Sequence, residues 1–330
     1  MSSVEDLGER RIIETILRYL DLPPNMPVSF GDDVSAVDLG HGKLAVIKTD
    51  MLVGKTDVPS GMSFWQAARK AVVMNISDLA AKGVQPIAIL ASLGVPRGLT
   101  KSDIEEIGKG LNAGAREYNA HVLGGDTNEA SDLIISCTAF GTCQKRFLVK
   151  RSGAKQGDLV AVTGFFGKPP AGLKILLERL SVPKKLEEAL VDSILMPQAR
   201  LKEGLALAQT RAVTASIDSS DGLAWSLHEI SRASNVGFFI DNLPVAKEAE
   251  EFAEIHNLNP TELCLYGGEE YELVLTIKPE LWEKANAAVH HVGGSLIRIG
   301  KVTREKSMLL KRKEKTILIE ARGWEHFKTN

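Results

Sequence analysis

Seven aspartates lie in five short polar segments that are spread over most of a 330-residue chain. Each segment joins apolar stretches, so its carboxylates lie at the ends of buried elements or inside them, where an ionised oxygen is costly unless a cation or hydrogen bonds compensate it. An oxygen-rich set without thiolates suits Mg²⁺ or Mn²⁺, and several such ions in one place usually indicate phosphoryl chemistry. The set therefore predicts a metal cage. The segments are Gly31-Asp32-Asp33, Lys48-Thr49-Asp50, Asn75-Ile76-Ser77-Asp78, Gly124-Gly125-Asp126-Thr127 and Asp218-Ser219-Ser220-Asp221-Gly222.

The composition is that of a soluble globular protein. With 44% hydrophobic and 25% charged residues and a formal charge of −2, the chain has no overall bias toward nucleic acid or a membrane surface. Its length predicts two domains. Cys137, Cys143 and Cys264 form no CxxC pair and indicate free thiols in a reducing cytosol. The polar, acidic start and the lack of a long uncharged apolar run predict a cytoplasmic protein without a signal peptide or a membrane span.

Apolar periodicity predicts alternating helices and strands, which indicates an α/β (α+β) fold. Residues 34–39 and 43–49 are typical of a hairpin whose ends carry aspartates. Residues 64–82 form a strong helix pattern that Gly83 closes. The Gly124-Gly125-Asp126 segment is predicted to be a tight turn between two strands.

A polar, Gly-containing stretch at residues 150–153 predicts a domain boundary. Residues 1–149 would then form an N-terminal domain and residues 150–330 a C-terminal α/β domain that completes the active site. The basic stretch at residues 311–315 indicates a solvated hairpin tip rather than a nucleic-acid contact, so no nucleic-acid partner is expected.

The helix that carries Asp78 is apolar almost all round, which is typical of a buried helix. Asn75 and Asp78 lie three residues apart and share a face, so they must meet something polar inside the protein. The alternative is an ordinary ion pair between Asp78 and Lys82, one helical turn along.

Asp218 and Asp221 flank two serines between a strand that ends at Ile217 and a predicted helix. The N-terminal amides of a helix bind anions, and carboxylates beside them bind the metal that accompanies the anion. The alternative is an N-cap formed by Ser219, Ser220 or Asp221, which would explain one aspartate but not the pair.

The commonest ATP-binding templates are absent from the sequence. It contains no Walker A loop, no kinase-like H-R-D loop and no G-x-G-x-x-G turn between a strand and a helix. The seven histidines show no metal-binding spacing. The aspartate segments remain the candidate site.

In their order along the chain, these segments and three further motifs resemble the thiamine-monophosphate kinase family, within the superfamily of aminoimidazole ribonucleotide synthetase. The resemblance covers almost the whole chain, and the combination of motifs is far more specific than any one of them. The further motifs are Arg151-Ser152-Gly153-Ala154-Lys155, Gly267-Gly268-Glu269-Glu270-Tyr271-Glu272-Leu273 and Trp324-Glu325-His326-Phe327.

The resemblance implies a two-domain fold of the aminoimidazole ribonucleotide synthetase type, with an N-terminal ATP- and Mg²⁺-binding domain that pairs in a homodimer, the two sheets closing into a barrel. It implies an enzyme that transfers a phosphoryl group from ATP to thiamine monophosphate with several Mg²⁺ ions as cofactor. By motif position, the implied metal ligands are Asp33, Thr49, Asp50, Asp78, Asp126, Asp218 and Asp221. The implied ATP contacts are Gly125, Asp126, Arg151 and Ser220, and the implied substrate contacts are Asp57, Glu269 and Trp324.

Three positions depart from the pattern of the family. Asp57 stands where many members have His, Glu270 replaces a more usual Asp, and Lys48 occupies a position that often carries a small hydroxyl which helps to bind metal. Two alternatives therefore stay open: an inactive nucleotide- or metal-binding subunit, and aminoimidazole ribonucleotide synthetase within the same fold.

The expected reaction needs no catalytic side chain. A phosphate monoester is already ionised near neutral pH, so its in-line attack on the γ-phosphorus of ATP requires no general base and no phosphoenzyme. Positioning and charge neutralisation would carry the rate. The ring of Trp324 could stack on the cationic thiazolium of the substrate, or serve as a plug of the C-terminal core.

Overall fold

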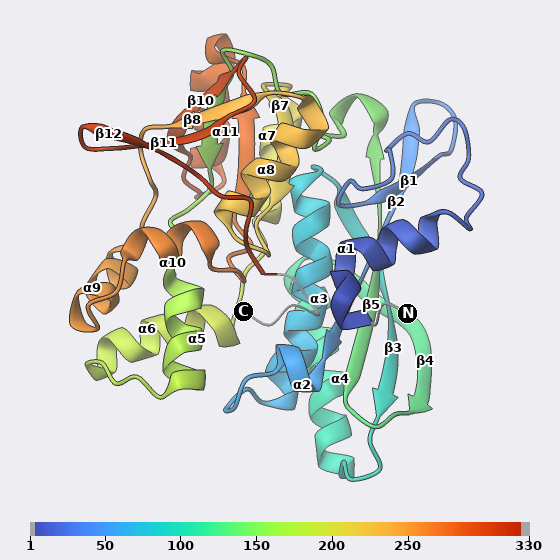
Figure 1. The fold of residues 1–330 in the computed structure, drawn as a ribbon. Coiled ribbons are helices and arrows are strands. Elements are labelled where there is room, and N and C mark those ends of the chain that lie inside the picture. The colour runs from blue at the N-terminus through green and yellow to red at the C-terminus, as the bar shows by residue number, and fades with distance from the viewer. Residues whose placement is uncertain (1–3, 325–330) are drawn as a thin grey trace.

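The computed structural model describes residues 4–324, and the last three residues of the Trp324 motif lie outside the described residues. Within this range the strands form two sheets, one in each half of the chain (Figure 1). The N-terminal sheet has the spatial order β1 (Ser35–Asp38), β2 (Lys43–Val53), β5 (Ile134–Gln144), β3 (Gln85–Val95) and β4 (His121–Glu129). The C-terminal sheet has the order β12 (Lys315–Leu318), β11 (Met308–Arg312), β8 (Gly237–Ile240), β10 (Ile297–Thr303), β6 (Leu159–Val162), β9 (Leu273–Ile277) and β7 (Val213–Asp218).

Helices cover both sheets. Those of the first half are α1 (Val4–Leu17), α2 (Gly54–Asp57), α3 (Phe64–Ala81) and α4 (Lys101–Glu117), followed by the 3-10 turn η1 (Lys145–Phe147). Those of the second half are α5 (Lys168–Glu178), α6 (Lys184–Leu195), α7 (Leu201–Thr210), α8 (Leu223–Ser234), α9 (Lys247–Ile255), α10 (Pro260–Tyr266) and α11 (Trp282–His291), with the 3-10 turn η2 (Pro279–Leu281).

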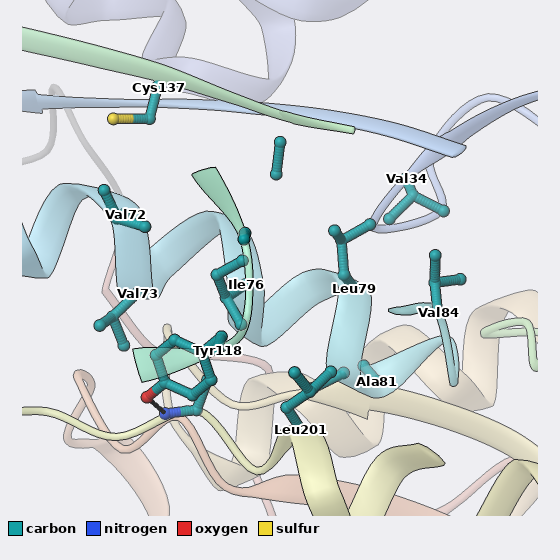
Figure 2. Close-up of a cluster of buried hydrophobic side chains, with 14 of the residues drawn as sticks. Val34, Val72, Val73, Ile76, Leu79, Ala81, Val84, Tyr118, Cys137 and Leu201 are labelled. Carbon is teal, nitrogen blue, oxygen red and sulfur yellow. Dashed lines mark hydrogen bonds between the residues drawn. The ribbon is translucent and has the colours of Figure 1, made fainter. Parts of the chain in front are cut away.

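The predicted helix at residues 64–82 is confirmed as α3. Ser63 and Gln66 form a capping box at its start, and Gly83, with φ 66°, takes the left-handed conformation just past its end. α3 packs on β2, β3 and β5 on one side and on α7 and β7 of the second half on the other. Figure 2 shows Ile76 and Leu79 of this helix among apolar side chains that include Leu201 of α7. Because neighbours surround the helix, its sequence is apolar nearly all round, and it is a rigid platform for polar groups.

The predicted hairpin is confirmed, with β1 antiparallel to β2. β2 runs on to Val53, so Asp50 lies inside a strand rather than at its end. The predicted turn at Gly124-Gly125-Asp126 is wrong, because these residues belong to β4, which pairs in parallel with β3. Glycine is required at position 125 because β4 lies close to β3 there: a Cβ at Gly125 would lie 1.7 Å from the carbonyl oxygen of Ala91.

The second half agrees with the predicted alternation of helices and strands. The basic stretch at residues 311–315 is a hairpin tip, as predicted, between the antiparallel strands β11 and β12. The three cysteines are free, as predicted. The predicted boundary at residues 150–153 falls between η1 and β6 and stays a prediction. Among the helices of residues 4–324, none has the length and hydropathy that crossing a membrane requires.

One face of the N-terminal sheet is left uncovered by the described chain. Helices α3 and α4 pack on the other face. Large apolar side chains point outward from the open face, with Ile47 39%, Met51 55%, Leu90 49% and Leu123 70% exposed. An apolar surface that extends over three strands is typical of an interface.

Candidate functional site

Four aspartates from four separate segments meet between the two halves of the chain. Oxygens of Asp33, Asp78 and Asp218 lie within 4.8 Å of one another, and all three residues are buried. Asp50 joins them through Lys48, whose Nζ lies 3.1 Å from Asp50 Oδ1 and 3.2 Å from Asp78 Oδ2. We refer to Asp33, Asp50, Asp78 and Asp218 as the carboxylate cluster.

Strand alternation and helix periodicity place these side chains. Leu44, Val46 and Leu52 are buried on the face of β2 that packs on α3. Lys48 and Asp50 have the same parity along β2 and therefore point to that same face. The end of β7 lies against α3, where Ser77 Oγ donates a 2.8 Å hydrogen bond to Asp218 Oδ2.

Two cations hold the loop before β1 against the second half. Lys82 Nζ lies 2.7 Å from Asp32 Oδ1 and 2.6 Å from Asp33 Oδ2, and it donates to the carbonyl oxygen of Ser216 at 2.7 Å. Arg151 Nε donates to Asp33 Oδ1 at 2.5 Å. The side chain of Asp33 is fully buried, and these two cations compensate its negative charge.

The alternative interpretation of Asp78 as an i,i+4 partner of Lys82 is wrong. Asp78 pairs with Lys48 from the neighbouring strand, and Lys82 pairs with Asp32 and Asp33. Lys82 is the C-cap of α3, beyond its last regular turn, and its side chain leaves toward the loop before β1.

The cluster carries more negative charge than its own cations compensate. Burial raises the pKa of Asp78, Lys48 lowers it and Asp218 raises it again. The pKa of Asp78 therefore lies well above the ordinary value. Burial and the charge of Asp33 raise the pKa of Asp218 to about 6. The pKa of Asp33 itself is lowered, because Lys82 and Arg151 outweigh burial. Burial disfavours the Lys48 ammonium, but Asp78 and Asp50 outweigh burial and raise the pKa of Lys48.

The loop after β7 packs against the Gly-Gly-Glu motif. Glu269 N donates to the carbonyl oxygen of Ser220 at 2.7 Å, and Tyr271 N donates to that of Ser219 at 3.2 Å. Gly222, with φ 107°, allows this contact, since a Cβ there would lie 2.7 Å from the carbonyl oxygen of Gly267. The N-cap alternative is wrong, because the N-cap of α8 is Gly222 and no side chain hydrogen-bonds there.

Asp221 lies half-buried on the loop after β7. Burial, and then the negative charge of Glu9 on α1, raises the pKa of Asp221 to about 7. The amide of Trp324 donates to the carbonyl oxygen of Asp221 at 3.1 Å, which brings the C-terminal segment onto this loop. The Trp324 side chain is 46% exposed, so it is not a plug of the core.

A second polar group lies around Glu269. Lys70, buried on α3, donates from Nζ to Glu269 Oε1 at 2.8 Å and to the carbonyl oxygen of Asp57 at 3.2 Å. The Tyr271 hydroxyl donates to Glu269 Oε2 at 3.0 Å. The carboxylate of Asp57 accepts from the amide of Val53 at 2.7 Å. The assignment of Asp57, Glu269 and Trp324 as substrate contacts stays a prediction; Lys70 links Asp57 to Glu269, and the Trp324 amide binds the loop after β7.

Three predicted residues of the N-terminal sheet, Thr49, Gly125 and Asp126, are not brought to the carboxylate cluster. Thr49 lies on the open face of the sheet, where its Oγ1 donates to the carbonyl oxygen of Cys137 at 3.1 Å. Asp126 is exposed on β4, three strand spacings from β2 and so roughly 14 Å away across the sheet. Across the sheet, Asp126 pairs with Ser92, Ser92 with Ser136, and Ser136 with Met51. Asp126 therefore lies on the open face, as Met51 does.

Reasoning from the sequence missed Lys70 and considered Lys82 only as a partner of Asp78. Lys70 and Lys82 are 1% and 0% exposed, and both bind carboxylates of the site. The available signal was their presence in a helix that is otherwise apolar all round, where a lysine must find a buried partner. Glu270 has a structural place instead: it is buried, and its Oε1 accepts from the amide of Gly167 at 2.5 Å.

The sequence matches the AIR synthase related protein family, over residues 31–143 for the N-terminal domain of that family and residues 155–311 for its C-terminal domain. The thiamine-monophosphate kinase of Nitrosopumilus maritimus is 36% identical over 297 residues, which cover 90% of this chain and 93% of the relative. That of Pyrococcus horikoshii is 38% identical over 302 residues, 91% of each chain. This chain belongs to the thiamine-monophosphate kinase family.

The fold agrees with this membership in the kinase family. A solved complex of AaThiL with AMPPCP and TMP matches the structure with a TM-score of 0.85 and 28% sequence identity, covering 99% of both chains. The predicted two-domain α/β fold of the aminoimidazole ribonucleotide synthetase type is thereby confirmed. In this kinase-family chain, the departure at Lys48 lies in the carboxylate cluster itself, whereas that at Glu270 is a buried structural contact.

Proposed function

We propose that this chain is a thiamine-phosphate kinase, an enzyme that uses ATP to phosphorylate thiamine monophosphate to thiamine diphosphate. One observation carries the proposal: the family motifs converge, with four aspartates meeting at the junction of the two halves and the Gly-Gly-Glu motif packed beside them. The family relatives carry this activity in their names, and the similar AaThiL structure holds TMP and AMPPCP, an ATP analogue.

The donor set fits Mg²⁺. Three buried carboxylates offer oxygens within 4.8 Å of one another, and burial together with neighbouring carboxylates raises the pKa values of Asp78 and Asp218, an unfavourable environment that a cation would compensate. We propose Asp50, Asp78, Asp218 and Asp221 as the main ligands, with Asp33, already paired with two cations, at the edge of the site. Bound Mg²⁺ would neutralise the charge of the phosphate groups that meet there.

Arg151 is placed to orient the nucleotide. Its guanidinium is fixed by Asp33 on one side and by Glu229, 3.4 Å from Nη1, on the other. A guanidinium held in this way loses little conformational freedom when a phosphate displaces one partner. We propose that Arg151 and Ser220 contact the nucleotide within one chain.

Asp126 would contact the nucleotide from the open face of the N-terminal sheet, where Thr49 also lies, and Gly125 precedes it in β4. We therefore propose a homodimer in which a second copy covers this face, the two sheets closing into a barrel. Support comes from the exposed apolar side chains of the open face, which a lone chain leaves in water.

With free thiols and no helix long and apolar enough to span a membrane among residues 4–324, we also propose a cytoplasmic location.

The acceptor would lie at the group around Glu269. Lys70 and Tyr271 fix both oxygens of the Glu269 carboxylate, so it is oriented before the substrate arrives. Carboxylates at Glu269 and Asp57 and the partly exposed ring of Trp324 suit a cationic thiazolium. The acceptor phosphate is already anionic, so no side chain need remove a proton. The residues of the site position the substrates and neutralise their charge.

Phosphorus NMR of the reaction tests the proposal. With ATP and Mg²⁺, thiamine monophosphate should give thiamine diphosphate and ADP, whereas free thiamine should be refused. Formylglycinamidine ribonucleotide in place of thiamine monophosphate tests the aminoimidazole ribonucleotide synthetase alternative, and absence of ADP release with every acceptor would favour the inactive-subunit alternative. Direct conversion of thiamine to its monophosphate would overturn the proposed mechanism.

A further inference from the structure

Lys48 lies inside the carboxylate cluster rather than beside it. Its Nζ bridges Asp50 Oδ1 at 3.1 Å and Asp78 Oδ2 at 3.2 Å. The side chain of Lys48 is 19% exposed and that of Asp78 is 8% exposed, so this pair is largely withdrawn from water. The ammonium therefore fills the space between two carboxylates whose charges would otherwise repel each other.

The rest of the cluster has other partners. Asp33 has Lys82 and Arg151, and Asp218 accepts a hydrogen bond from a serine. Removal of Lys48 would thus leave two carboxylates of the cluster without the cation that now separates them, and would open space at the same point. A divalent cation is the natural occupant of such a space, because carboxylate oxygens without a nearby cation are costly when buried.

An ammonium and a divalent ion cannot use these oxygens in the same way at the same time. Mg²⁺ binds oxygens at about 2.0–2.1 Å and requires an octahedral shell, whereas an ammonium donates hydrogen bonds at about 2.7–3.2 Å. The bridge made by Lys48 has the second geometry. Lys48 also retains a third N–H that can point toward a phosphate oxygen.

We propose that the Lys48 ammonium takes the place of one divalent ion between Asp50 and Asp78, as a cation tethered to β2 that faces the transferred phosphoryl group. The inference rests on the proposed function, because it assigns a role within metal-assisted phosphoryl transfer. It makes the chain bind one ion fewer per active site than the same site would bind with a small side chain at this position. Part of the charge neutralisation is then independent of the Mg²⁺ concentration.

The test counts bound ions. Wild type, Lys48→Ser and Lys48→Met are titrated with Mn²⁺ in the presence of saturating AMPPCP, and bound Mn²⁺ per chain is measured by equilibrium dialysis and by electron paramagnetic resonance. Lys48→Ser, which opens the space and supplies a hydroxyl, should bind one more ion than wild type. Lys48→Met, which fills the space without charge, should bind no additional ion. Lys145→Ser, at a surface lysine paired with Asp38, is the matched control and should leave the count unchanged.

A measurement on the wild-type protein keeps the test decisive if a variant does not fold. Amine groups are labelled by reductive methylation, and labelling at Lys48 is read by peptide mass spectrometry with and without saturating Mn²⁺ and AMPPCP. Lys48 should be protected in both conditions, while Lys145, 60% exposed, should be labelled in both. Labelling of Lys48 that appears only when the ions bind would show that they displace the ammonium, and would overturn the proposal.

An equal ion count in wild type and Lys48→Ser would also overturn it. The kinase assay with thiamine monophosphate, run on the same wild-type preparation, separates the two claims. Activity with an unchanged ion count rejects the role of Lys48 alone. If Lys48→Ser binds an additional ion but the wild type does not phosphorylate thiamine monophosphate, the proposed substrate is rejected and the proposed role of Lys48 stands.

Discussion

Replacement of Lys82 by Met should be among the most destabilising single substitutions of a lysine in this chain. The Lys82 side chain is 1% exposed, and its Nζ lies within 2.7 Å of oxygens of Asp32, Asp33 and Ser216. Methionine matches the length and much of the volume of lysine, so packing is largely preserved. The loss is therefore electrostatic: two carboxylates, 7% and 0% exposed, lose a shared cation, and Asp33 keeps Arg151.

Breaking a buried ion pair by removing one partner costs about 3–5 kcal/mol, because the remaining charge stays buried without compensation. At roughly 2 °C per kcal/mol for a chain of this size, Lys82→Met should lower Tm by roughly 6–10 °C without Mg²⁺. The loss should become smaller as the pH falls below 3.8 toward the lowered pKa of Asp33, because a protonated Asp33 no longer needs the cation. Burial raises the pKa of Asp33, and Lys82 has the largest effect among the three cations, Lys82, Arg151 and Lys48, that lower it.

Thermal unfolding followed by circular dichroism, from pH 3 to pH 8 and with EDTA, measures this effect. Lys101→Met is the matched control, since Lys101 is 93% exposed and its pair with Glu105 spans 3.5 Å at the surface. That control should leave Tm unchanged. A decrease of less than about 2 °C for Lys82→Met at neutral pH would refute the reasoning, because it would mean that Asp32 and Asp33 do not depend on Lys82 for compensation.

Four further predictions follow from the site and the open face. Asp78→Asn should lower kcat by about 100-fold or more at saturating Mg²⁺ while circular dichroism shows an intact fold, and activity within threefold of wild type would reject a metal ligand at this position. Burial raises the pKa of Asp218 to about 6 and that of Asp221 to about 7, from 3.8, so the folded apo protein holds protons that the unfolded chain has lost. The contribution of these two groups to the stability of the metal-free protein should therefore rise as the pH falls from about 7 to about 4. Tm should depend less steeply on pH in Asp221→Asn, and also in the wild type with saturating Mg²⁺. Lys70→Met should raise the KM for thiamine monophosphate more than that for ATP in steady-state kinetics, because it releases the carboxylate at the acceptor group, and an equal rise in both would contradict this placement. Met51→Glu should convert the proposed dimer into monomers in sedimentation velocity, and a wild type that is already monomeric and active at micromolar concentration would rule the dimer out.

Much of the fold follows from local sequence patterns. α3 was predicted because its apolar pattern and the closing Gly83 agree. The β1–β2 hairpin was predicted because its turn and its two strands are neighbours in sequence. The Gly124-Gly125-Asp126 turn was wrong because glycine has two uses, and a single sequence does not distinguish a turn from a close approach to β3.

The residue content of the site was likewise available from the sequence, and its contacts were not. Aspartates in apolar surroundings predicted a cation site, since buried carboxylates need compensation wherever they lie. Which cation compensates which carboxylate depends on long-range pairing. An ion pair between Lys82 and Asp78 along the helix was the alternative interpretation, yet Lys82 reaches the loop before β1, and Asp78 pairs with Lys48 from the adjacent strand.

The sequence by itself determined the elements of this protein, the family motifs and the presence of a polar site with many carboxylates. Local propensity and burial depend on residue type and on neighbours in the chain, which the sequence contains. Tertiary structure alone decided the face of each strand, so that Lys48 and Asp50 point toward α3 while Thr49 points to the open side. It also decided the ion pairs, because charges interact over a few ångströms in space between residues that can be far apart along the chain.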